Sequence, residues 1–501
     1  MRQLFFLLAV LATGMAQAQK IADPKPFANT ITEDDLKKHL YIVAGKDFEG
    51  RETATEGQRK AAAYIENHFK SLGLQPGNNG SYQMYYPVYR DSLASAAIQI
   101  NDKQFTLNED FAVSIGSDYS STLYGSDIVY VGYGLSDSSR DDYKGLNVKG
   151  KIVLVLNGVP PGYLQSPATR RMFNAYGKQD AAQKNGAIAV LVIQTDFPRK
   201  DPSSLGNMYL NPYKKVIRPN TYYVSEKIAQ AIMGDDYNAA KNGNAQPKTY
   251  TTNIMLQINK TTMSLQSSDV LGFLEGTDLK DQLVVISAHY DHLGKHGDVI
   301  YYGADDDGSG TVSILEISEA FAKAKAAGKG PRRSILFLAN SGEEKGLWGS
   351  EYYSDHPAYN LDKTTVDLNI DMIGRLDDSR KKGDSTNYVY VIGDDKLSSD
   401  LKPISEGVNK KYTKLELDYK YNDPKDPERI YYRSDHFNFA RKGVPIIFYY
   451  DGMLDRDYHQ PTDTPDKISY DLMAKRAKLV FFTAWEMANR NDMLKRDIPL
   501  Q

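Results

Sequence analysis

Acidic and imidazole side chains follow several apolar runs in the second half of this chain, where they could bind a cation. These runs are LVVISAHYDH with His289 and Asp291, SILFLANSGEEKG with Glu343 and Glu344, VDLNIDMIG with Asp371, and VPIIFYYDGMLDRDYH with His459. A strand rises about 3.3 Å per residue, so neighbouring strands can bring the residues at their ends close together. Two imidazoles with several carboxylates suit zinc or a similar divalent ion, and a shared carboxylate would allow a site for two ions.

A further acidic stretch, GADDDGSGTVSILE at residues 303–316, nearly fills the template of a calcium-binding loop. In that template the loop lies between two helices. The residues before this stretch, LVVISAHYDHLG and DVIYYG, predict strand and loop instead of an entering helix. We therefore expect a loop that presents carboxylates at the start of the following helix, with Asp307 or Ser309 as its cap.

The rest of the chain predicts the elements that position these side chains. Residues 30–72 predict two helices, and residues 96–260 change to Tyr-, Val-, Ile- and Gly-rich runs typical of a separate β-rich module. From Ser268 onward, apolar strands alternate with amphipathic helices, the last near residues 471–489. This pattern predicts an α/β fold with a mixed, partly parallel sheet sandwiched by helices. Ligands of such sheets bind at the carboxyl ends of the strands.

Length and composition limit the possible classes of function. The chain has 501 residues, of which 41% are hydrophobic and 25% charged, so it can form a large core and more than one domain. Its formal net charge of -3 shows no basic excess that would favour nucleic acid or an anionic membrane surface. The chain contains no cysteine, so any metal ion must bind to His, Asp and Glu.

The first residues, MRQLFFLLAVLATGMAQAQK, have the pattern of an export signal. Arg2 precedes an apolar run, and small residues at Ala16 and Ala18 form a cleavage motif. We expect residues 1–18 to be a signal peptide and the mature protein to be periplasmic or secreted. The apolar run is far shorter than the ~20 residues that span a bilayer, so no stable membrane insertion is expected.

The motifs HYD, GADDDGSG, SGEEKGLWGS, NIDMIG and YHQPTDTPDKI, in this order, resemble those of metallopeptidase family 28. This family comprises co-catalytic zinc exopeptidases typified by bacterial leucyl aminopeptidases. Outside the site, FEGRETATEGQRKAAAYIENHFKSLGLQPG resembles the family's N-terminal helical segment, and residues 118–250 are similar to the protease-associated domain that many members carry as an insertion. The resemblance implies three parts: an N-terminal helical part of the peptidase domain at 19–95, the inserted β-rich domain at 96–262, and the zinc peptidase catalytic domain at 263–501.

The resemblance also implies a cofactor of two zinc ions. The residues that would bind them are His289 and Asp371 for one ion, Glu344 and His459 for the other, and Asp306 as the bridge. Glu343 matches the general base that takes a proton from the attacking water, and Asp291 matches the carboxylate that orients the first histidine. The family pattern further implies a cis peptide bond between Asp306 and Asp307.

Other polar residues near these motifs are expected to have no direct role. Asp305 and Asp307 are predicted to shape their loop, and His292 and His296 to be solvated. His436 is predicted to cap or pack a helix. The remaining candidates are histidines expected on the surface or in packing, and two tyrosines in a loop that could line a pocket: His39, His68, His356, Tyr431 and Tyr432.

The function that the resemblance implies is hydrolysis of amino-terminal residues from peptide substrates by an exported two-zinc aminopeptidase. A carboxypeptidase or a glutaminyl cyclase on the same scaffold is one alternative. A non-catalytic, receptor-like binding protein is another, and the unsubstituted ligand positions argue against it. Side-chain preference, release of single residues or dipeptides, and oligomeric state have no sequence signal.

Overall fold

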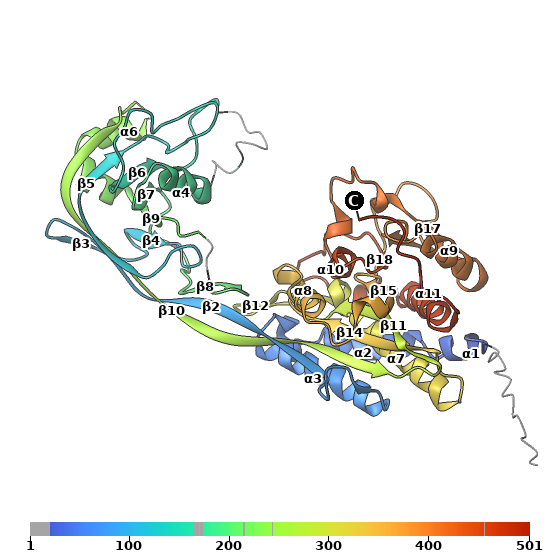
Figure 1. Ribbon diagram of the computed structural model, residues 1–501. Helices are drawn as coiled ribbons and strands as arrows, with labels where there is room; N and C mark the ends of the chain where they lie inside the picture. The colour runs from blue at the N-terminus through green and yellow to red at the C-terminus, as the bar shows by residue number, and fades with distance from the viewer. Residues whose placement is uncertain are drawn as a thin grey trace, which may run out of the picture. The chain divides into compact units, whose positions relative to one another are not determined.

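The computed structural model describes residues 21–163, 170, 174–213, 216–242, 244–454 and 456–500 (Figure 1). The chain forms two compact units. The first combines the residues up to Tyr86 with Ser267–Gln501, and the second is Pro87–Gln266. The expected signal peptide, residues 1–18, lies outside the described residues. Within the described ranges, no helix has the length and apolar character needed to cross a membrane.

The first unit is built on a mixed β-sheet. Its strands, in spatial order, are β17 (Glu416–Asp418), β16 (Tyr388–Ile392), β18 (Ile446–Tyr450), β15 (Thr364–Ile370), β11 (Leu279–His289), β14 (Arg333–Asn340) and the end of β10 (Lys248–Leu274), which also pairs with β1 (Gln75–Pro76). The central strands β18, β15, β11 and β14 are parallel neighbours. In contrast, β16 pairs antiparallel with β18, and β10 with β14. The prediction of a mixed, partly parallel sheet is confirmed.

Helices cover both faces of this sheet. They are α1 (Lys25–Ala28), α2 (Glu33–Val43), α3 (Glu56–Ser71), α7 (Gly310–Ala326), α8 (Trp348–Asp355), α9 (Leu401–Tyr412), α10 (His436–Arg441) and α11 (Tyr470–Asn489). The two helices predicted between residues 30 and 72 are α2 and α3. Each begins at a threonine, Thr32 or Thr55, whose hydroxyl accepts a hydrogen bond from a backbone N–H of the first turn.

The strand β11 shows how one sheet serves two cores. Its residues Val284 and Ile286 belong to a core that includes α2, α3, α7 and α11, whereas Leu283 and Val285 belong to a second core that includes α8 and α10. Successive side chains of a strand point to opposite faces, so a continuous apolar run is required when both faces are covered. The continuous apolar runs of the sequence therefore indicate a sheet that is buried on both faces.

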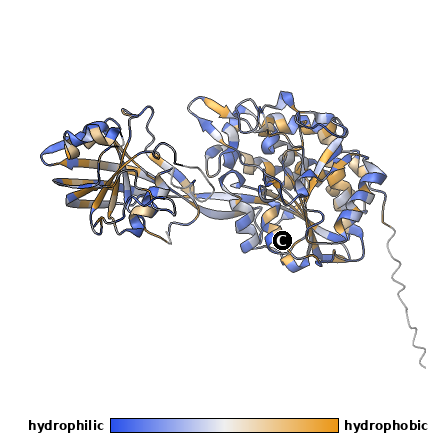
Figure 2. Cartoon of the chain, turned by 90° about the horizontal axis from the view of Figure 1, so that it is seen from above, coloured by the Kyte–Doolittle hydropathy of each residue, from blue (hydrophilic) through white to orange (hydrophobic). Residues whose placement is uncertain are grey.

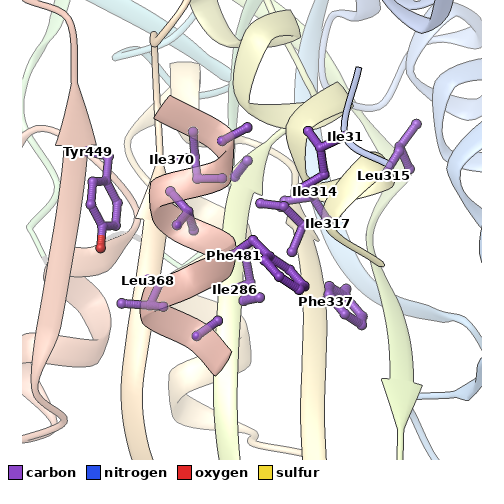
Figure 3. Packing of buried hydrophobic residues seen from close by; sticks show 14 of the residues in the cluster. Ile31, Ile286, Ile314, Leu315, Ile317, Phe337, Leu368, Ile370, Tyr449 and Phe481 are labelled. Atoms are coloured by element: carbon purple, nitrogen blue, oxygen red, sulfur yellow. The ribbon is translucent and has the colours of Figure 1, made fainter. Parts of the chain in front are cut away.

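The helix α11 packs its aromatic residues onto one face of the sheet. Figure 3 shows Phe481 of this helix beside Ile286 and Phe337 of the strands. The ring centroid of Phe481 lies 4.8 Å from that of Phe321 in α7, which in turn lies 5.7 Å from that of Trp485. These aromatic contacts join α7 and α11 above the strands whose ends carry the candidate site residues.

The second unit contains the remaining strands of the sheet, which continues through β10, and has its own cores. Its strands include the first part of β10, then β5 (Ser121–Tyr130), β6 (Ile152–Leu156), β7 (Ala189–Ile193), β9 (Asn220–Val224) and β4 (Phe111–Val113), in that spatial order. The long strand β2 (Gln83–Ile100) pairs with β3 (Lys103–Phe105) and β8 (Leu205–Tyr209). Its helices include α4 (Ala175–Lys184), α5 (Glu226–Met233) and α6 (Asp236–Lys241).

The alternation seen in β11 recurs in β6 of the second unit. Ile152 and Leu154 belong to one core and Val153 and Val155 to another. Figure 2 shows hydrophobic residues concentrated on the strands inside each unit. The second unit is therefore stabilised by its own apolar interior. The resemblance of residues 118–250 to a protease-associated domain stays a prediction.

Stability at mildly acidic pH is expected to depend on His68 in α3. Its ring lies 5.0 Å from that of His39, and its Nε2 atom lies 3.3 Å from the carbonyl oxygen of Leu315. Burial, reinforced by His39, lowers the pKa of His68 to about 4, below the ordinary 6.5. Between these values the unfolded chain binds more protons, so the free energy of unfolding should decrease as pH falls from 6.5 towards 4.

Urea unfolding of the wild type and of His68→Gln across this pH range measures the effect. The variant should lose part of the pH dependence, whereas His356→Gln, a change at an exposed histidine, should keep it. If the free energy of unfolding depended equally on pH in the wild type and in His68→Gln, His68 would not be the group responsible.

Candidate metal centre

The predicted site residues meet at one edge of the sheet in the first unit. His289 is the last residue of β11 and Asp371 follows β15 directly, while Glu343 and Glu344 lie in a short 3-10 helix after β14. His459 lies in the loop that follows β18. Because β18, β15, β11 and β14 are parallel neighbours, their carboxyl ends lie at the same edge.

The acidic loop reaches the same edge from a turn of π-helix at Ala304–Ser309 that leads into α7. The peptide bond between Asp306 and Asp307 is cis, as the family pattern implied. Neighbouring carboxylates tie this loop to the protein: Oδ1 of Asp305 accepts from the N–H of Gly374 at 2.8 Å, and Oδ1 of Asp307 accepts from that of Met372 at 3.0 Å. These hydrogen bonds support the prediction that the two aspartates shape the loop, but Oδ2 of Asp307 has no partner among the described residues and is available to a cation.

A first group of ligand atoms surrounds His289. Its Nε2 atom lies 3.2 Å from Oδ1 of Asp306 and 3.6 Å from Oδ1 of Asp371. Asp307 contributes to the same group, because one ligand atom each from His289, Asp307 and Asp371 lie within 4.8 Å of one another. All of these residues are buried.

A second group lies on the other side of Asp306. The Nε2 atom of His459 is 3.1 Å from Oδ2 of Asp306 and 3.0 Å from Oε2 of Glu344. The Nδ1 atom of His292 is 2.8 Å from Oε1 of Glu344 and 3.9 Å from Oδ2 of Asp306. Asp306 therefore presents one carboxylate oxygen to each group.

The prediction that His292 is solvated is wrong. Its side chain is fully buried, and its backbone N–H donates to the carbonyl oxygen of Arg51 at 3.3 Å. Glu52 forms a β-bridge with it. The loop after β11 is covered by a segment far away in the sequence, which is why local sequence gave no signal. His296, four residues further along, is exposed as expected.

The donor set fits divalent cations. Several buried atoms have no hydrogen-bond partner among the described residues: Nε2 of His289, Nδ1 of His292, Oδ2 of Asp306, Oδ2 of Asp307 and Oε1 of Glu344. Buried polar atoms are nearly always paired, so converging unpaired nitrogen and oxygen atoms indicate a missing partner. Mixed imidazole and carboxylate donors suit zinc.

The pKa shifts of the site also favour a bound divalent cation. Burial lowers the pKa of His459, but the carboxylates of Asp306 and Glu344 outweigh burial and raise it to about 10. Burial raises the pKa of Asp307 well above its usual range, and Asp371 adds to the shift. Several carboxylates confined at one buried edge create a negative field that a divalent cation would neutralise.

Asp291 connects several parts of the site. It is fully buried. Its Oδ2 atom accepts from the hydroxyl of Thr53 at 2.6 Å, and its Oδ1 atom accepts from the backbone N–H of Glu343 at 3.2 Å. Its Oδ1 atom also lies 3.7 Å from Nδ1 of His289, while its backbone carbonyl is closer, at 3.1 Å. Asp291 therefore lies where it can orient both His289 and Glu343.

A pocket opens beside the first group. It is lined by three acidic residues, one arginine and a set of apolar and aromatic side chains: Asp306, Glu343, Asp371, Arg433, Met372, Ile430, Phe448, Tyr450, Leu454 and Tyr458. The guanidinium of Arg433 donates to the hydroxyl of Tyr458 at 3.2 Å, and the ring of Tyr458 stacks on that of His459 at 3.9 Å between centroids. An apolar wall thus adjoins the acidic ligand atoms.

The remaining candidates lie outside this pocket. His436 is buried, its ring stacks on Phe448 at 4.7 Å, and its Nε2 atom lies 2.8 Å from the carbonyl oxygen of Tyr431, which confirms its packing role. Tyr431 and Tyr432 line a different pocket, which Arg429 also lines. In the same loop, the residues that do reach the metal-side pocket are Ile430 and Arg433.

Arg51 is a structural residue that sequence analysis missed. It is fully buried and its guanidinium donates to carbonyl oxygens on three segments: those of Val43, Tyr290, Tyr302 and Gly303, at 2.7 to 2.9 Å. Two of these segments are the loop after β11 and the start of the acidic loop. The FEGRETATEG motif that contains Arg51 was noted only as part of the helical segment.

Comparisons with known proteins agree with this geometry. Residues 269–484 match the sequence model of the family described as Peptidase family M28. A probable leucine aminopeptidase from Trichophyton verrucosum is 31% identical over 214 residues, which are 42% of this chain and 55% of that protein. Leucine aminopeptidase 1 from Uncinocarpus reesii is 28% identical over 316 residues, 58% of this chain and 72% of that protein. The chain spans little more than half the length of the first of these relatives.

Solved structures share the fold over most of the chain. An aminopeptidase from Aneurinibacillus sp. strain AM-1 has a TM-score of 0.56 at 19% identity, covering 96% of this chain and 100% of that chain. A zinc aminopeptidase from Bacillus subtilis has a TM-score of 0.53 at 19% identity, covering 94% of this chain and 99% of that chain. At these identities the likeness shows the fold alone, and it confirms the predicted fold class.

Replacement of Arg51 by methionine tests its role in holding the loops. The variant should lower the free energy of unfolding by about 3 kcal/mol or more, because it leaves several buried carbonyl oxygens without a donor. The control is Arg59→Met: Arg59 is exposed and pairs with Glu56, so its loss should cost less than about 1 kcal/mol. Urea denaturation of both variants gives the comparison, and equal, small losses would show that Arg51 does not hold the loops.

Proposed function

Because residues 269–484 match the sequence model of peptidase family M28, we propose that this chain is a two-zinc aminopeptidase that removes amino-terminal residues from peptides. The observation that carries the proposal is the convergence of carboxylates and imidazoles from several strand ends, with ligand atoms 3.0 to 3.6 Å apart around Asp306. The pocket that opens beside them supports a substrate site.

The proposed ligands are those that the family resemblance implies, and their side-chain atoms face one another. His289 and Asp371 would hold the first ion, and Glu344 and His459 the second. Asp306 would bridge, because its Oδ1 atom faces His289 and its Oδ2 atom faces His459. A pair of zinc ions bound there would polarise the scissile carbonyl and make water a better nucleophile at neutral pH.

Glu343 is the proposed general base. Its Oε2 atom lies 3.9 Å from Nε2 of His289, and its side chain lines the pocket without belonging to either group of ligand atoms. Burial raises the pKa of Glu343 well above its usual range. A raised pKa makes its carboxylate a stronger base, able to take a proton from the attacking water and return it to the leaving amine.

Asp291 is the proposed positioning residue. By accepting the backbone N–H of Glu343 and lying beside His289, it would fix the base relative to the first ion. It touches neither the pocket nor the ligand atoms of the second group, so its effect would pass through its neighbours.

The pocket suggests which first side chain is preferred. Its apolar wall of Met372, Phe448, Tyr450 and Leu454 suits an apolar first side chain. The relatives named leucine aminopeptidases fit this preference. We propose apolar amino-terminal residues as preferred substrates. Export, as periplasmic or secreted protein, remains part of the proposal through the signal at residues 1–18.

The three alternative functions require different substrate contacts and different metal contents. A carboxypeptidase would bind the free carboxylate of its substrate, for which Arg433 is the cationic group of this pocket. A glutaminyl cyclase would convert amino-terminal glutamine and works with a single zinc ion. A receptor-like protein would bind no catalytic metal. Cleavage of carboxyl-terminal residues, cyclisation of glutaminyl peptides and zinc content distinguish the three.

Replacing Glu343 by glutamine should separate catalysis from metal binding. We expect turnover to fall at least 100-fold, the lower end of what loss of a general base costs, with about two zinc ions retained per chain. Asp306→Asn is the matched comparison, because loss of the bridging carboxylate should remove zinc as well as activity. Near wild-type turnover of Glu343→Gln with unchanged zinc content would contradict its role as base.

A free amino terminus should be essential in the substrate. Metal-replete protein should cleave leucine p-nitroanilide but not its acetylated form, because an aminopeptidase requires a free amino terminus. The leucine substrate should also be cleaved faster than the glutamate analogue. Cleavage of acetylated and free substrates at similar rates would rule out aminopeptidase action.

A further inference from the structure

We propose that His292 is a third imidazole ligand of the metal centre and binds the second cation through Nδ1, together with Asp306, Glu344 and His459. This inference rests on the proposed function, since it concerns the same pair of ions. It adds a residue outside the ligand set that the family resemblance implies, and one that sequence analysis assigned to solvent.

The distances fit a shared cation. Zinc binds nitrogen and oxygen at about 2.0 to 2.2 Å, so two donors in a tetrahedral shell lie roughly 3.4 Å apart. The Nδ1 atom of His292 lies 2.8 Å from Glu344 and 3.9 Å from Asp306, on either side of that value. One ligand atom each from His292, Asp306 and Glu344 lie within 4.8 Å of one another. These are the separations expected around one ion.

The contact between His292 and Glu344 is an ion pair only if the ring is protonated. Although 2.8 Å separates Nδ1 of His292 from Oε1 of Glu344, neither atom has a partner with hydrogen-bond geometry among the described residues. With Nδ1 unprotonated, two buried acceptors this close would repel each other, and a cation within reach of both would remove that repulsion. Ligation through Nδ1 leaves the ring proton on Nε2.

The surrounding chain holds the ring in this position. Gly303 has a φ of +57°, and a Cβ there would lie 2.5 Å from Cγ of the His292 ring and 2.4 Å from the carbonyl oxygen of Asp306. A side chain at residue 303 would clash with the ring in its present position. The backbone of His292 is fixed from the other direction by Arg51 and Glu52. The ring is thus placed by packing, as a preorganised ligand requires.

The additional ligand makes the two ions unequal. The second ion would have two imidazoles, His292 and His459, among its candidate donors, whereas the first group has one imidazole, His289, among carboxylates. The pocket is lined by Asp371, Asp306 and Glu343 but by neither imidazole of the second group. The proposed base Glu343 also lines this pocket and lies 3.9 Å from His289, so the first ion would be the one nearer the substrate.

Extended X-ray absorption of the zinc-loaded wild type tests this without any substitution. Three imidazoles shared by two ions should give an average of about 1.5 imidazole nitrogens per zinc, against about 1.0 if only His289 and His459 bind. An average near 1.0 with two zinc ions bound would overturn the inference and leave the proposed function intact. A wild type that binds no divalent ion would overturn the proposed function itself.

Titration of apo-protein with Co²⁺, followed by calorimetry and visible absorption, tests the residue directly. His292→Gln should weaken one of two binding steps by more than about 100-fold and change the absorption bands, while the other step stays the same. A loss within about 10 to 100-fold is typical of a residue that only orients a ligand and would overturn the proposal. The control is His296→Gln, because this exposed histidine ends the short strand β12 (Gly294–His296), and the change should affect neither step. Circular dichroism of the apo-proteins confirms that the variants fold.

Discussion

Negative charge buried at the ends of parallel strands is the constraint on which the rest of this structure depends. Asp305, Asp306 and Asp307 are consecutive and all buried. Burial raises the pKa of Asp305 and Asp307 well above their usual range. It also disfavours the charge of Asp306, but contacts with His289 and His459 outweigh burial and hold its pKa well below that range. Such a cluster is stable only where imidazoles, backbone N–H groups and cations share the charge.

Backbone N–H groups divide these aspartates into two kinds. Asp305 and Asp307 each use one oxygen to bind N–H groups at the end of β15 or the start of α7. The N–H groups of Asp305 and Asp306 in turn donate to the carboxylate of Asp463. The loop is fixed at both sides, and the carboxylate of Asp306 is left facing the two histidines. The middle residue of the motif is available for the proposed bridging role because hydrogen bonds hold its neighbours in the loop.

The residues that hold the candidate ligands in place come from distant parts of the chain. Arg51 and Thr53 lie before the second unit in the sequence, yet they contact the loops that carry His289, Asp291 and the acidic stretch. A single buried guanidinium satisfies carbonyl oxygens on several loops at once, so its loss would free all of them. Both groups of candidate ligand atoms belong to the first unit. The second unit is stabilised by its own hydrophobic cores and contributes no residue to either group of candidate ligand atoms.

The sequence by itself determined the elements and the residue types of the site. Continuous apolar runs such as LVVISA predicted strands buried on both faces, and the acidic or imidazole residues that follow them predicted a metal centre, because strand period and ligand chemistry are local properties. Only the tertiary structure decided what depends on contacts between distant segments. His292 and His296 look alike in sequence, but the segment at Arg51 and Glu52 buries one and leaves the other exposed. Burial is set by what packs against a residue, and no local pattern records that.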